Sequence, residues 1–187
     1  MKPKYRSVEE LLNRIDEPQR SRCVQILNDN RKLFATVPGS SHNHQAWKGG
    51  YLDHVEETMN LAVVLYTPIA SLRPLPFLLS DALLVLFLHD IEKPWKYDLT
   101  KKGKLIYKEE LKDKKSQHAF REKKLKEYKL KLTVAQKNAI RYAEGEHDDY
   151  SRTTRVMSPL AAFCHMCDVA SARIWFDYPD PWTKAKR

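Results

Sequence analysis

The sequence has few glycines and few signals for tight turns. Five glycines occur in 187 residues, and neither Asn-Gly nor Asp-Gly, the dipeptides typical of β-hairpins, is present. Sustained alternation of apolar and polar residues, the pattern of a half-buried strand, is also missing. These absences leave little room for a β-sheet and favour an all-α fold.

Cysteine is equally sparse. The three cysteines, Cys23, Cys164 and Cys167, are an odd number, which argues against a disulfide scaffold and fits a reducing compartment. Cys164 and Cys167 form one C-x-x-C pair. Without a second pair this is weak evidence for zinc or redox chemistry, so we expect buried thiols.

Long hydrophobic runs are missing too. Prolines and charged residues interrupt the most apolar region, residues 61–88, so no stretch of about 20 apolar residues is available to span a bilayer. The segment MKPKYRSVEELLNRI becomes charged too early for the apolar core of a signal peptide. We therefore expect a cytoplasmic protein without a membrane partner.

Positive charge is present in excess. The net charge of +9 favours an anionic partner, such as a nucleotide or a nucleic acid, because a basic field raises the local concentration of anions. The lysine-rich residues 101–131 are interpreted as a solvated face. The functional alternative is a basic rim that steers polyanions, with Tyr97, Tyr107 and Tyr128 stacking on bases.

Helical signals cover most of the chain, which is long enough for one domain with a genuine core. Ser7 and Glu10 form a capping-box pattern for a short first helix that ends at Pro18. A second helix is expected over residues 19–34, and a third from Leu52 to about Tyr66, where Pro68 stops it.

Three more helices are expected after residue 78. Ser80 or Asp81 caps a helix that carries ALLVLFLHD, and its continuous apolar run indicates burial at the domain centre. Thr133 caps a helix that reaches about Gly145, and Ser158 caps the last one, which has proline in its first turn.

Histidines recur beside acidic residues in these segments: His54, His89, His118 and His147. Asp168 lies in an otherwise apolar helix, where a buried carboxylate without a partner is costly. A cation is a suitable partner, because imidazole and carboxylate are the usual ligands of Mn²⁺, Fe²⁺, Co²⁺, Ni²⁺ and Zn²⁺. At the end of a helix, His89 and Asp90 can straddle such an ion.

Two segments and three later residues carry a family resemblance. HQAWKGGYLDHV at 44–55 and LFLHDIEKPWKY at 86–97, followed by His118, His147 and Asp168, resemble the HD-domain metal-dependent phosphohydrolases. The likeness covers residues 41–173. It implies an all-α, single-domain HD-type helical bundle with the metal site at its centre. Residues 1–40 would form N-terminal helices packed on the core, residues 41–175 the HD domain, and residues 176–187 a C-terminal tail.

The resemblance also implies roles for individual residues. The first metal would be held by His54, His89, Asp90 and Asp168. In members with two metals, His118 and His147 would hold the second ion, with Asp90 bridging. The cofactor is therefore one or two divalent transition-metal ions, with Mg²⁺ as a further candidate. Lys93 corresponds to a lysine that contacts phosphate.

These roles define a hypothesis for the chemistry. A metal-activated water would hydrolyse a phosphate ester of a nucleotide or oligonucleotide, with Asp90 as bridging ligand and Lys93 neutralising phosphate charge. His44, like His42 and Lys48 in the same loop, is a candidate for substrate contact or proton delivery. Two alternatives stay open: an HD-type di-iron oxygenase, and a non-catalytic nucleic-acid-binding or regulatory HD module.

The chain also departs from the family pattern. Glu92 stands where many members have glycine, which predicts a narrower or more acidic approach to the metal. His147-Asp148 replaces the His-His pair of some two-metal members. His42 and His165 are interpreted as capping, surface or packing residues. The aromatic residues near the end of the sequence are expected to pack on the domain or to form a homodimer contact: Trp175, Phe176, Tyr178 and Trp182.

Overall fold

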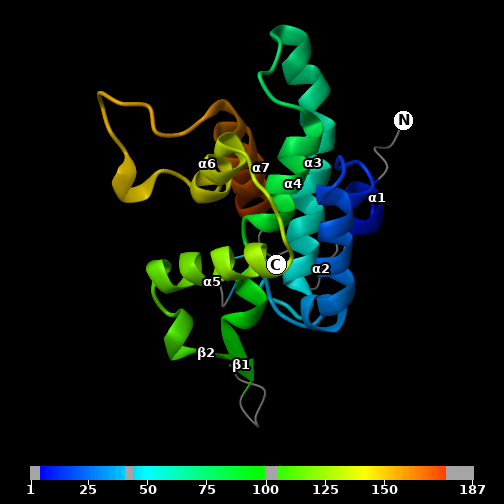
Figure 1. Cartoon of the computed structure of the whole chain (residues 1–187), viewed down its shortest axis with the longest axis vertical. Coiled ribbons are helices and arrows are strands. Elements are labelled where there is room, and N and C mark those ends of the chain that lie inside the picture. The colour runs from blue at the N-terminus through cyan, green and yellow to red at the C-terminus, as the bar shows by residue number, and fades with distance from the viewer. Residues whose placement is uncertain (1–4, 41–43, 100–104, 176–187) are drawn as a thin grey trace.

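A computed structural model describes residues 5–40, 44–99 and 105–175. This described part is mostly helical, which confirms the all-α prediction at the level of fold class (Figure 1). Its α-helices are α1 Val8–Leu12, α2 Gln19–Phe34, α3 Gly50–Leu72, α4 Leu79–Leu88, α5 Lys114–Glu127, α6 Val134–Tyr142 and α7 Pro159–Ile174. Short 3₁₀ helices occupy Lys93–Trp95, Glu109–Leu111 and His147–Asp149.

A small β-hairpin is the element that the sequence signals did not predict. Strands β1 Tyr97–Leu99 and β2 Leu105–Tyr107 pair antiparallel, with Asp98 opposite Ile106. The residues that connect them, 100–104, lie outside the described part of the chain. The hairpin leads from the end of α4 toward α5, below the main body in the view of Figure 1.

Three predicted helix caps are confirmed. The Ser7 hydroxyl accepts from the backbone N–H of Glu10 at 3.3 Å, and the Glu10 carboxylate accepts from the N–H of Ser7 at 3.0 Å. Thr133 forms the same reciprocal pair with Gln136 at the start of α6, and the Ser158 hydroxyl accepts from the N–H of Ala161 at the start of α7. Each cap satisfies a backbone donor that the helix cannot, an effect of typically ~1 kcal/mol.

Three predicted helix limits are wrong. Helix α1 ends at Leu12, well before Pro18, which is instead the N-cap of α2. Pro68 lies inside α3, which continues to Leu72. Because Pro68 is close to the end of the helix, its missing N–H removes one backbone hydrogen bond but does not end the helix. The N-cap of α4 is Leu78, and neither Ser80 nor Asp81 takes that position. The carboxylate of Asp81, in the first turn, instead accepts from the N–H of Leu78 at 3.0 Å.

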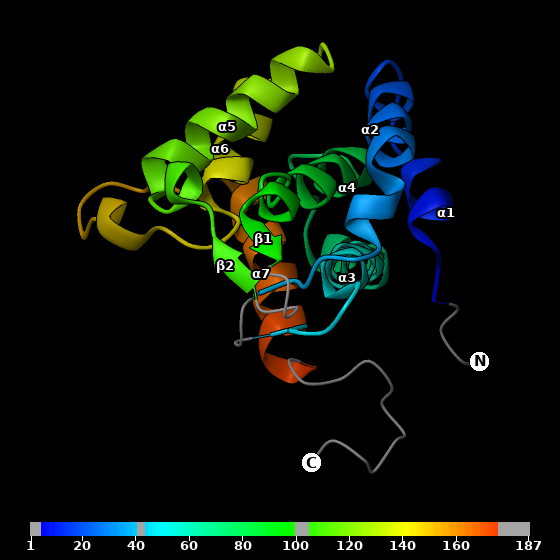
Figure 2. The ribbon, with the colours of Figure 1, turned by 90° about the horizontal axis from the view of Figure 1, so that it is seen from below.

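Helix α4 lies at the centre of the molecule, as the sequence predicted. It contacts α2, α3, α6 and α7, and these helices surround it in the view of Figure 2. Every side chain from Ala82 to Leu88 is buried. Each fully buried leucine contributes roughly 1.5–3 kcal/mol relative to an exposed one. This burial fixes the position of the residues that follow α4.

The N-terminal helices pack against this centre. Helix α1 contacts α3 and α4, and α2 contacts α4, so that Leu11, Leu12 and Phe34 join the same hydrophobic core. Among the described residues, no helix combines the length and the apolar character needed to cross a membrane.

Candidate metal centre

Three helices bring one ligand-bearing side chain each to a common point. These are His54 from α3, His89 directly after α4, and Asp168 from α7, and their ligand atoms all lie within 4.8 Å of one another. Asp168 Oδ1 lies 3.0 Å from His54 Nε2 and 3.5 Å from His89 Nε2. Both histidines are fully buried, whereas the Asp168 side chain is 13% exposed, so the group can be reached from solvent.

The end of α4 explains how two adjacent residues reach one point. Neighbouring residues in a regular helix point about 100° apart. Here α4 ends at Leu88, and the chain turns at once, with the N–H of Lys93 donating to the carbonyl of Asp90 at 3.0 Å. As a result, Asp90 Oδ2 lies 3.3 Å from His89 Nε2 and 3.6 Å from His54 Nε2.

The unsatisfied atoms at this point fit a bound cation. Among the described residues, the Nε2 atoms of His54 and His89 and Oδ1 of Asp90 are buried and form no hydrogen bond of acceptable geometry, although carboxylate oxygens lie 3.0–3.6 Å from the two imidazole nitrogens. Buried polar atoms normally form a hydrogen bond. His89 Nδ1 lies 2.8 Å from the carbonyl oxygen of Leu86, which can only accept, so in a neutral imidazole Nε2 carries the lone pair. Buried lone pairs that converge in this way are the donor set of a divalent transition metal.

The charges of the centre favour a cation. Burial alone would lower the pKa of His89, but the carboxylates of Asp90 and Asp168 outweigh it and raise this pKa to about 10. Burial would raise the pKa of Asp168, but His54 and His89 hold it well below its usual range. The two carboxylates therefore create a negative field at the imidazoles, which attracts a proton or a metal ion alike.

Lys93 stands at the edge of the same group. Its ammonium contacts the Asp90 carboxylate, and Nζ lies 3.6 Å from Oε1 of Glu144. Burial would lower the pKa of Lys93, but Asp90, Glu144 and Asp168 raise it. Lys93 thus carries a fixed positive charge beside the candidate metal centre.

His44 also lies beside the centre. Its ring centroid is 5.0 Å from that of His54, and its Nδ1 lies 2.6 Å from Oε1 of Gln45. Burial, the neighbouring His54 and Lys93 lower the pKa of His44. Of the other residues predicted in this loop, Lys48 is exposed and His42 lies outside the described residues.

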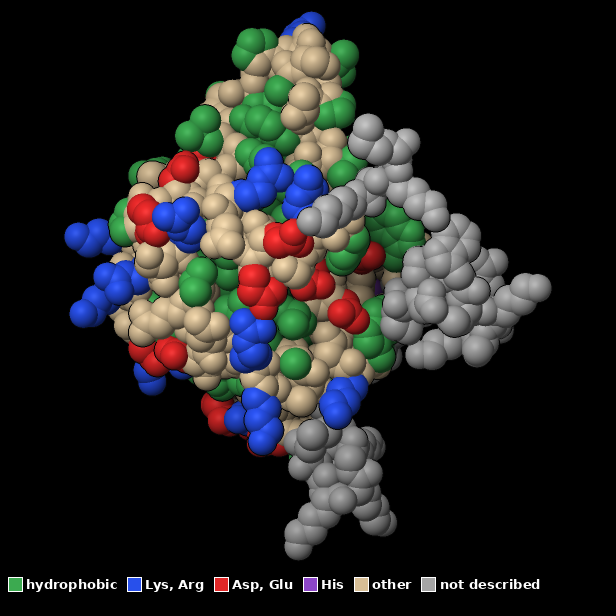
Figure 3. Space-filling model, turned by 90° about the vertical axis from the view of Figure 1, so that its right-hand side faces the viewer, with side chains coloured by type: hydrophobic (Ala, Val, Ile, Leu, Met, Phe, Trp, Pro, Cys, Tyr) green, Lys and Arg blue, Asp and Glu red, His purple; other side chains and the backbone are tan. Residues whose placement is uncertain are grey.

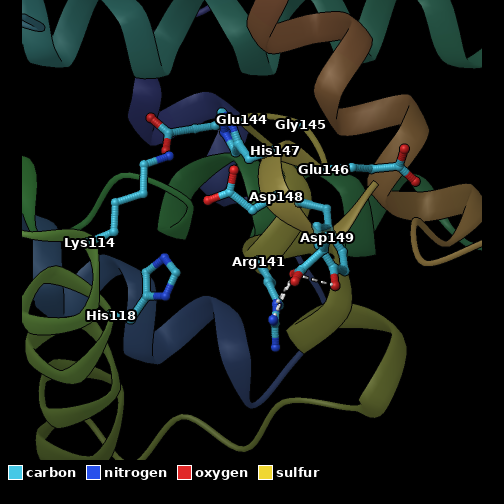
Figure 4. Close-up of a pocket in the computed structure, with 10 residues that line it drawn as sticks. Lys114, His118, Arg141, Glu144, Gly145, Glu146, His147, Asp148 and Asp149 are labelled. Carbon is cyan, nitrogen blue, oxygen red and sulfur yellow. Dashed lines mark hydrogen bonds and ion pairs between the residues drawn. The ribbon is translucent and has the colours of Figure 1, made fainter. Parts of the chain in front are cut away.

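His118 and His147 lie away from this group and line a neighbouring pocket. In the described part of the chain, neither belongs to a group of three metal-binding side chains. Both are exposed, and both line a pocket of about 160 Å³ (Figure 4). The pocket is lined by Lys114, His118, Arg141, Tyr142, Glu144, Gly145, Glu146, His147, Asp148 and Asp149. Glu144 connects it to the metal centre through its contact with Lys93.

Glu92 does not make the approach to the metal narrower or more acidic. Its side chain is buried and forms a two-pronged ion pair with Arg121 of α5, with distances of 2.8 Å from Nε and 2.9 Å from Nη2. Arg121 Nη1 also donates to the carbonyl of Ile140 at 3.2 Å. Glu92 therefore attaches α5 to the segment that carries Asp90 and Lys93.

The tyrosines proposed for base stacking divide into two groups. Tyr128 is buried in the core, and its hydroxyl accepts from Asn30 Nδ2 at 3.0 Å, so its proposed stacking role is wrong. Tyr97 and Tyr107 face each other across the hairpin, with ring centroids 4.9 Å apart. Tyr107 is 46% exposed and Tyr97 is buried.

The expected packing residues behave as predicted where they are described. Cys164 and Cys167 are buried free thiols. His165 packs against the end of α6, where its Nδ1 donates a hydrogen bond to the carbonyl of Ala143 at 2.8 Å. Trp175 is half-buried after α7. The remaining predicted aromatic residues lie outside the described part of the chain: Phe176, Tyr178 and Trp182.

Surface charge is mixed on the face that carries α1 and α2. Figure 3 shows acidic and basic side chains lying beside one another there. Within the lysine-rich segment, most side chains of α5 are exposed, as expected for a solvated helix face. Arg121 and Leu125 are buried, and four more are partly buried: Ser116, Gln117, Phe120 and Lys124.

Sequence reasoning missed three residues behind the centre: Gln45, Glu57 and Ser171. The Gly49-Gly50 pair shows how Gln45 is positioned, because a Cβ on Gly50 would lie 1.9 Å from the backbone oxygen of Gln45. Gly49 has a φ of 82°, which glycine adopts without strain. The glycine pair was visible in the sequence, but the residue that it accommodates was not.

Comparisons of the chain with models of known families, with curated proteins and with solved structures gave no match.

Proposed function

We propose that this protein is an HD-type metal-dependent phosphohydrolase that cleaves a phosphate ester of a nucleotide or oligonucleotide. The observation that carries the proposal is the convergence of His54, His89 and Asp168 from three helices, with buried imidazole Nε2 atoms that lack hydrogen-bond partners in the described structure. The order of these residues along the chain is the order on which the family resemblance rests.

The donor set indicates which ion the centre would hold. Two imidazoles and one or two carboxylates suit Mn²⁺, Fe²⁺, Co²⁺, Ni²⁺ or Zn²⁺, and the buried Cys164 and Cys167 are not part of the group. We propose one ion at His54, His89, Asp90 and Asp168, whose side chains already lie together. A second ion at His118 and His147 is a separate proposal.

The chain's own residues supply the other requirements of phosphate ester hydrolysis. A bound divalent ion polarises a phosphoryl oxygen and lowers the pKa of water. Lys93 would bind a phosphate oxygen by a charge-assisted hydrogen bond, in exchange for one of its two carboxylate contacts. His44, beside His54, would hold or accept a proton during the reaction. The pocket beyond Glu144 would accommodate the rest of the substrate.

The test is hydrolysis of p-nitrophenyl phosphate, bis(p-nitrophenyl) phosphate and a nucleotide panel by protein reloaded with each candidate ion. We expect activity that requires the ion and that falls at least about 100-fold in Asp168→Asn, since the loss of even an outer partner of a ligand costs roughly 10- to 100-fold and Asp168 is itself a proposed ligand. Asp29→Asn, an exposed carboxylate on α2, is the matched control and should keep full activity.

Three results would contradict this proposal. One is the absence of hydrolysis of every substrate by protein with its metal fully loaded. Another is two bound irons with oxygen uptake and no phosphatase activity, which would establish the oxygenase alternative. The third is nucleic-acid binding that weakens steeply with salt, persists without metal and is accompanied by no hydrolysis, as a regulatory module would show.

A further inference from the structure

A buried hydrogen-bond network lies behind the metal centre, on the side of α3 and α7. Oε2 of Glu57 is its common acceptor, at 2.6 Å from Ser171 Oγ and 2.8 Å from Gln45 Nε2. Ser171 Oγ lies 3.1 Å from His54 Nδ1, and Gln45 Oε1 lies 2.6 Å from His44 Nδ1. The network therefore joins one carboxylate to two histidines at the centre.

The position of the Ser171 hydroxyl proton determines the direction of the hydrogen bond between Ser171 and His54. A carboxylate can only accept, and a hydroxyl has a single proton, so the short contact with Glu57 uses the Ser171 proton. Gln45 Nε2 donates to Ser171 Oγ at 3.0 Å. The oxygen is left with one acceptor site, which His54 Nδ1–H fills. In that tautomer the proton is on Nδ1, and the lone pair is on Nε2, the atom that faces His89 and Asp168.

The orientation of the Gln45 amide determines the direction of the hydrogen bond between Gln45 and His44. Its nitrogen must face Glu57, because the carboxylate offers no proton. Its oxygen then faces His44 and can only accept, so His44 donates from Nδ1. The lone pair of His44 is consequently on Nε2. Gln45 is 1% exposed and its backbone packs against Gly50, so its amide is held in place.

We propose that Glu57 is a positioning residue that sets the tautomers of both His54 and His44, through Ser171 and Gln45, so that each presents an unprotonated Nε2 to the metal centre. The inference rests on the proposed metal site and assigns it residues outside the ligand set. His54 would use its lone pair to bind the ion. His44 would use its lone pair as a fixed proton acceptor beside the centre.

Glu57→Gln tests the proposal without changing the size of the side chain. A glutamine amide can donate to Ser171 Oγ, which frees the Ser171 proton to point at His54 Nδ1 and moves the imidazole proton to Nε2. We expect the affinity for Zn²⁺, measured by competition with a chromophoric chelator, to fall about 10- to 100-fold, the usual effect of losing an outer partner of a ligand.

Glu56→Gln is the matched control. Glu56 neighbours Glu57 on α3, burial raises the pKa of both carboxyl groups, and the Glu56 carboxylate accepts a hydrogen bond, from the N–H of Val8 at 2.8 Å. That contact leads to α1 and away from the metal centre. Glu56→Gln should therefore bind Zn²⁺ as tightly as the wild type, and the loss should be specific to Glu57.

A second measurement reads the tautomers directly. Nitrogen-15 NMR of the histidine rings in the Zn²⁺-loaded wild type should show His54 and His44 protonated at Nδ1. Gln45→Met removes the His44 branch and the bond from Gln45 to Ser171, but it keeps the Ser171–Glu57 bond that directs the Ser171 proton away from His54. In this variant the His44 signal should become a mixture of tautomers while Zn²⁺ affinity changes less than about threefold. Ser171→Ala, which removes the branch to His54, should also reduce Zn²⁺ affinity. This variant replaces Glu57→Gln as the test if Glu57→Gln does not fold.

The outcomes separate this inference from the proposed function. If the wild type binds no metal, or if His54→Ala binds Zn²⁺ as the wild type does, the metal centre itself is refuted. If the wild type binds Zn²⁺ through His54 but Glu57→Gln and Ser171→Ala bind it as tightly as Glu56→Gln, the positioning role is overturned. Protonation of His44 at Nε2 in the wild type would overturn the His44 branch.

Discussion

Replacing Glu92 should destabilise the protein strongly, because its ion pair with Arg121 is buried. The two side chains are 3% and 7% exposed, and two hydrogen bonds of 2.8 and 2.9 Å join them. Removing one partner of such a pair leaves an uncompensated buried charge, which costs about 3–5 kcal/mol. Total stabilities are typically ~5–15 kcal/mol, so Glu92→Gln should remove a large fraction of the free energy of unfolding.

Urea unfolding followed by far-UV circular dichroism would measure this loss at fixed metal concentration. The double variant Glu92→Met/Arg121→Met should lose less free energy of unfolding than Glu92→Met and Arg121→Met lose in sum, because it leaves no unpaired buried charge. Glu127→Gln is the control: it removes the 3.0 Å pair with Lys124, in which the Glu127 side chain is 49% exposed, and should change stability by less than about 0.5 kcal/mol. A loss below about 1 kcal/mol in Glu92→Gln, or additive effects in the double variant, would refute the reasoning.

Further changes test the centre, the core and the lysine-rich surface. Zn²⁺ at about 100 times its dissociation constant should raise the free energy of unfolding by about 2.7 kcal/mol in the wild type and much less in Asp168→Asn; an equal gain in both would exclude Asp168 as a ligand. Leu86→Ala should lower the free energy of unfolding by about 2–5 kcal/mol in urea, since Leu86 is fully buried in α4, and a loss under 1 kcal/mol would contradict the central position of that helix. Tyr128→Phe removes only the hydroxyl that accepts from Asn30 and should cost about 0.5–1.5 kcal/mol. Tyr128→Leu also removes the ring and should leave single-stranded DNA binding unchanged in fluorescence anisotropy; weaker binding would restore the stacking role.

The features that the sequence predicted correctly depend on local patterns. The caps at Ser7, Thr133 and Ser158 follow from side chains that bond to a backbone N–H three residues further on. The central position of α4 follows from a run that is apolar on all sides. Neither inference requires knowledge of a distant part of the chain.

The candidate metal ligands were predicted from residue type and order, and the structure brings only some of them together. His54, His89 and Asp168 could be predicted because each is a polar residue on an otherwise buried helix face, where an ion is a sufficient reason for its presence. His118 and His147 match the order of residues on which the family resemblance rests, but they are exposed and line the neighbouring pocket. Order along a chain does not determine which face of a helix a side chain occupies.

The features that the sequence did not predict are mostly pairings over long distances. Glu92 and Arg121 are 29 residues apart, and Gln45 and Ser171 are 126 residues apart. No local pattern marks such partners, and a lone glutamate next to a His-Asp doublet suggested a role at the metal. Packing decides instead: Glu92 faces α5, and its charge is compensated there.

The most direct test of the account is a crystal structure of the protein grown with Mn²⁺, Co²⁺ or Zn²⁺, with the ion located by anomalous scattering. We expect an anomalous peak for an ion bound by His54 Nε2, His89 Nε2 and carboxylate oxygens of Asp90 and Asp168. A fully loaded protein whose ion lies elsewhere, or the absence of any bound ion at saturating metal concentration, would contradict it.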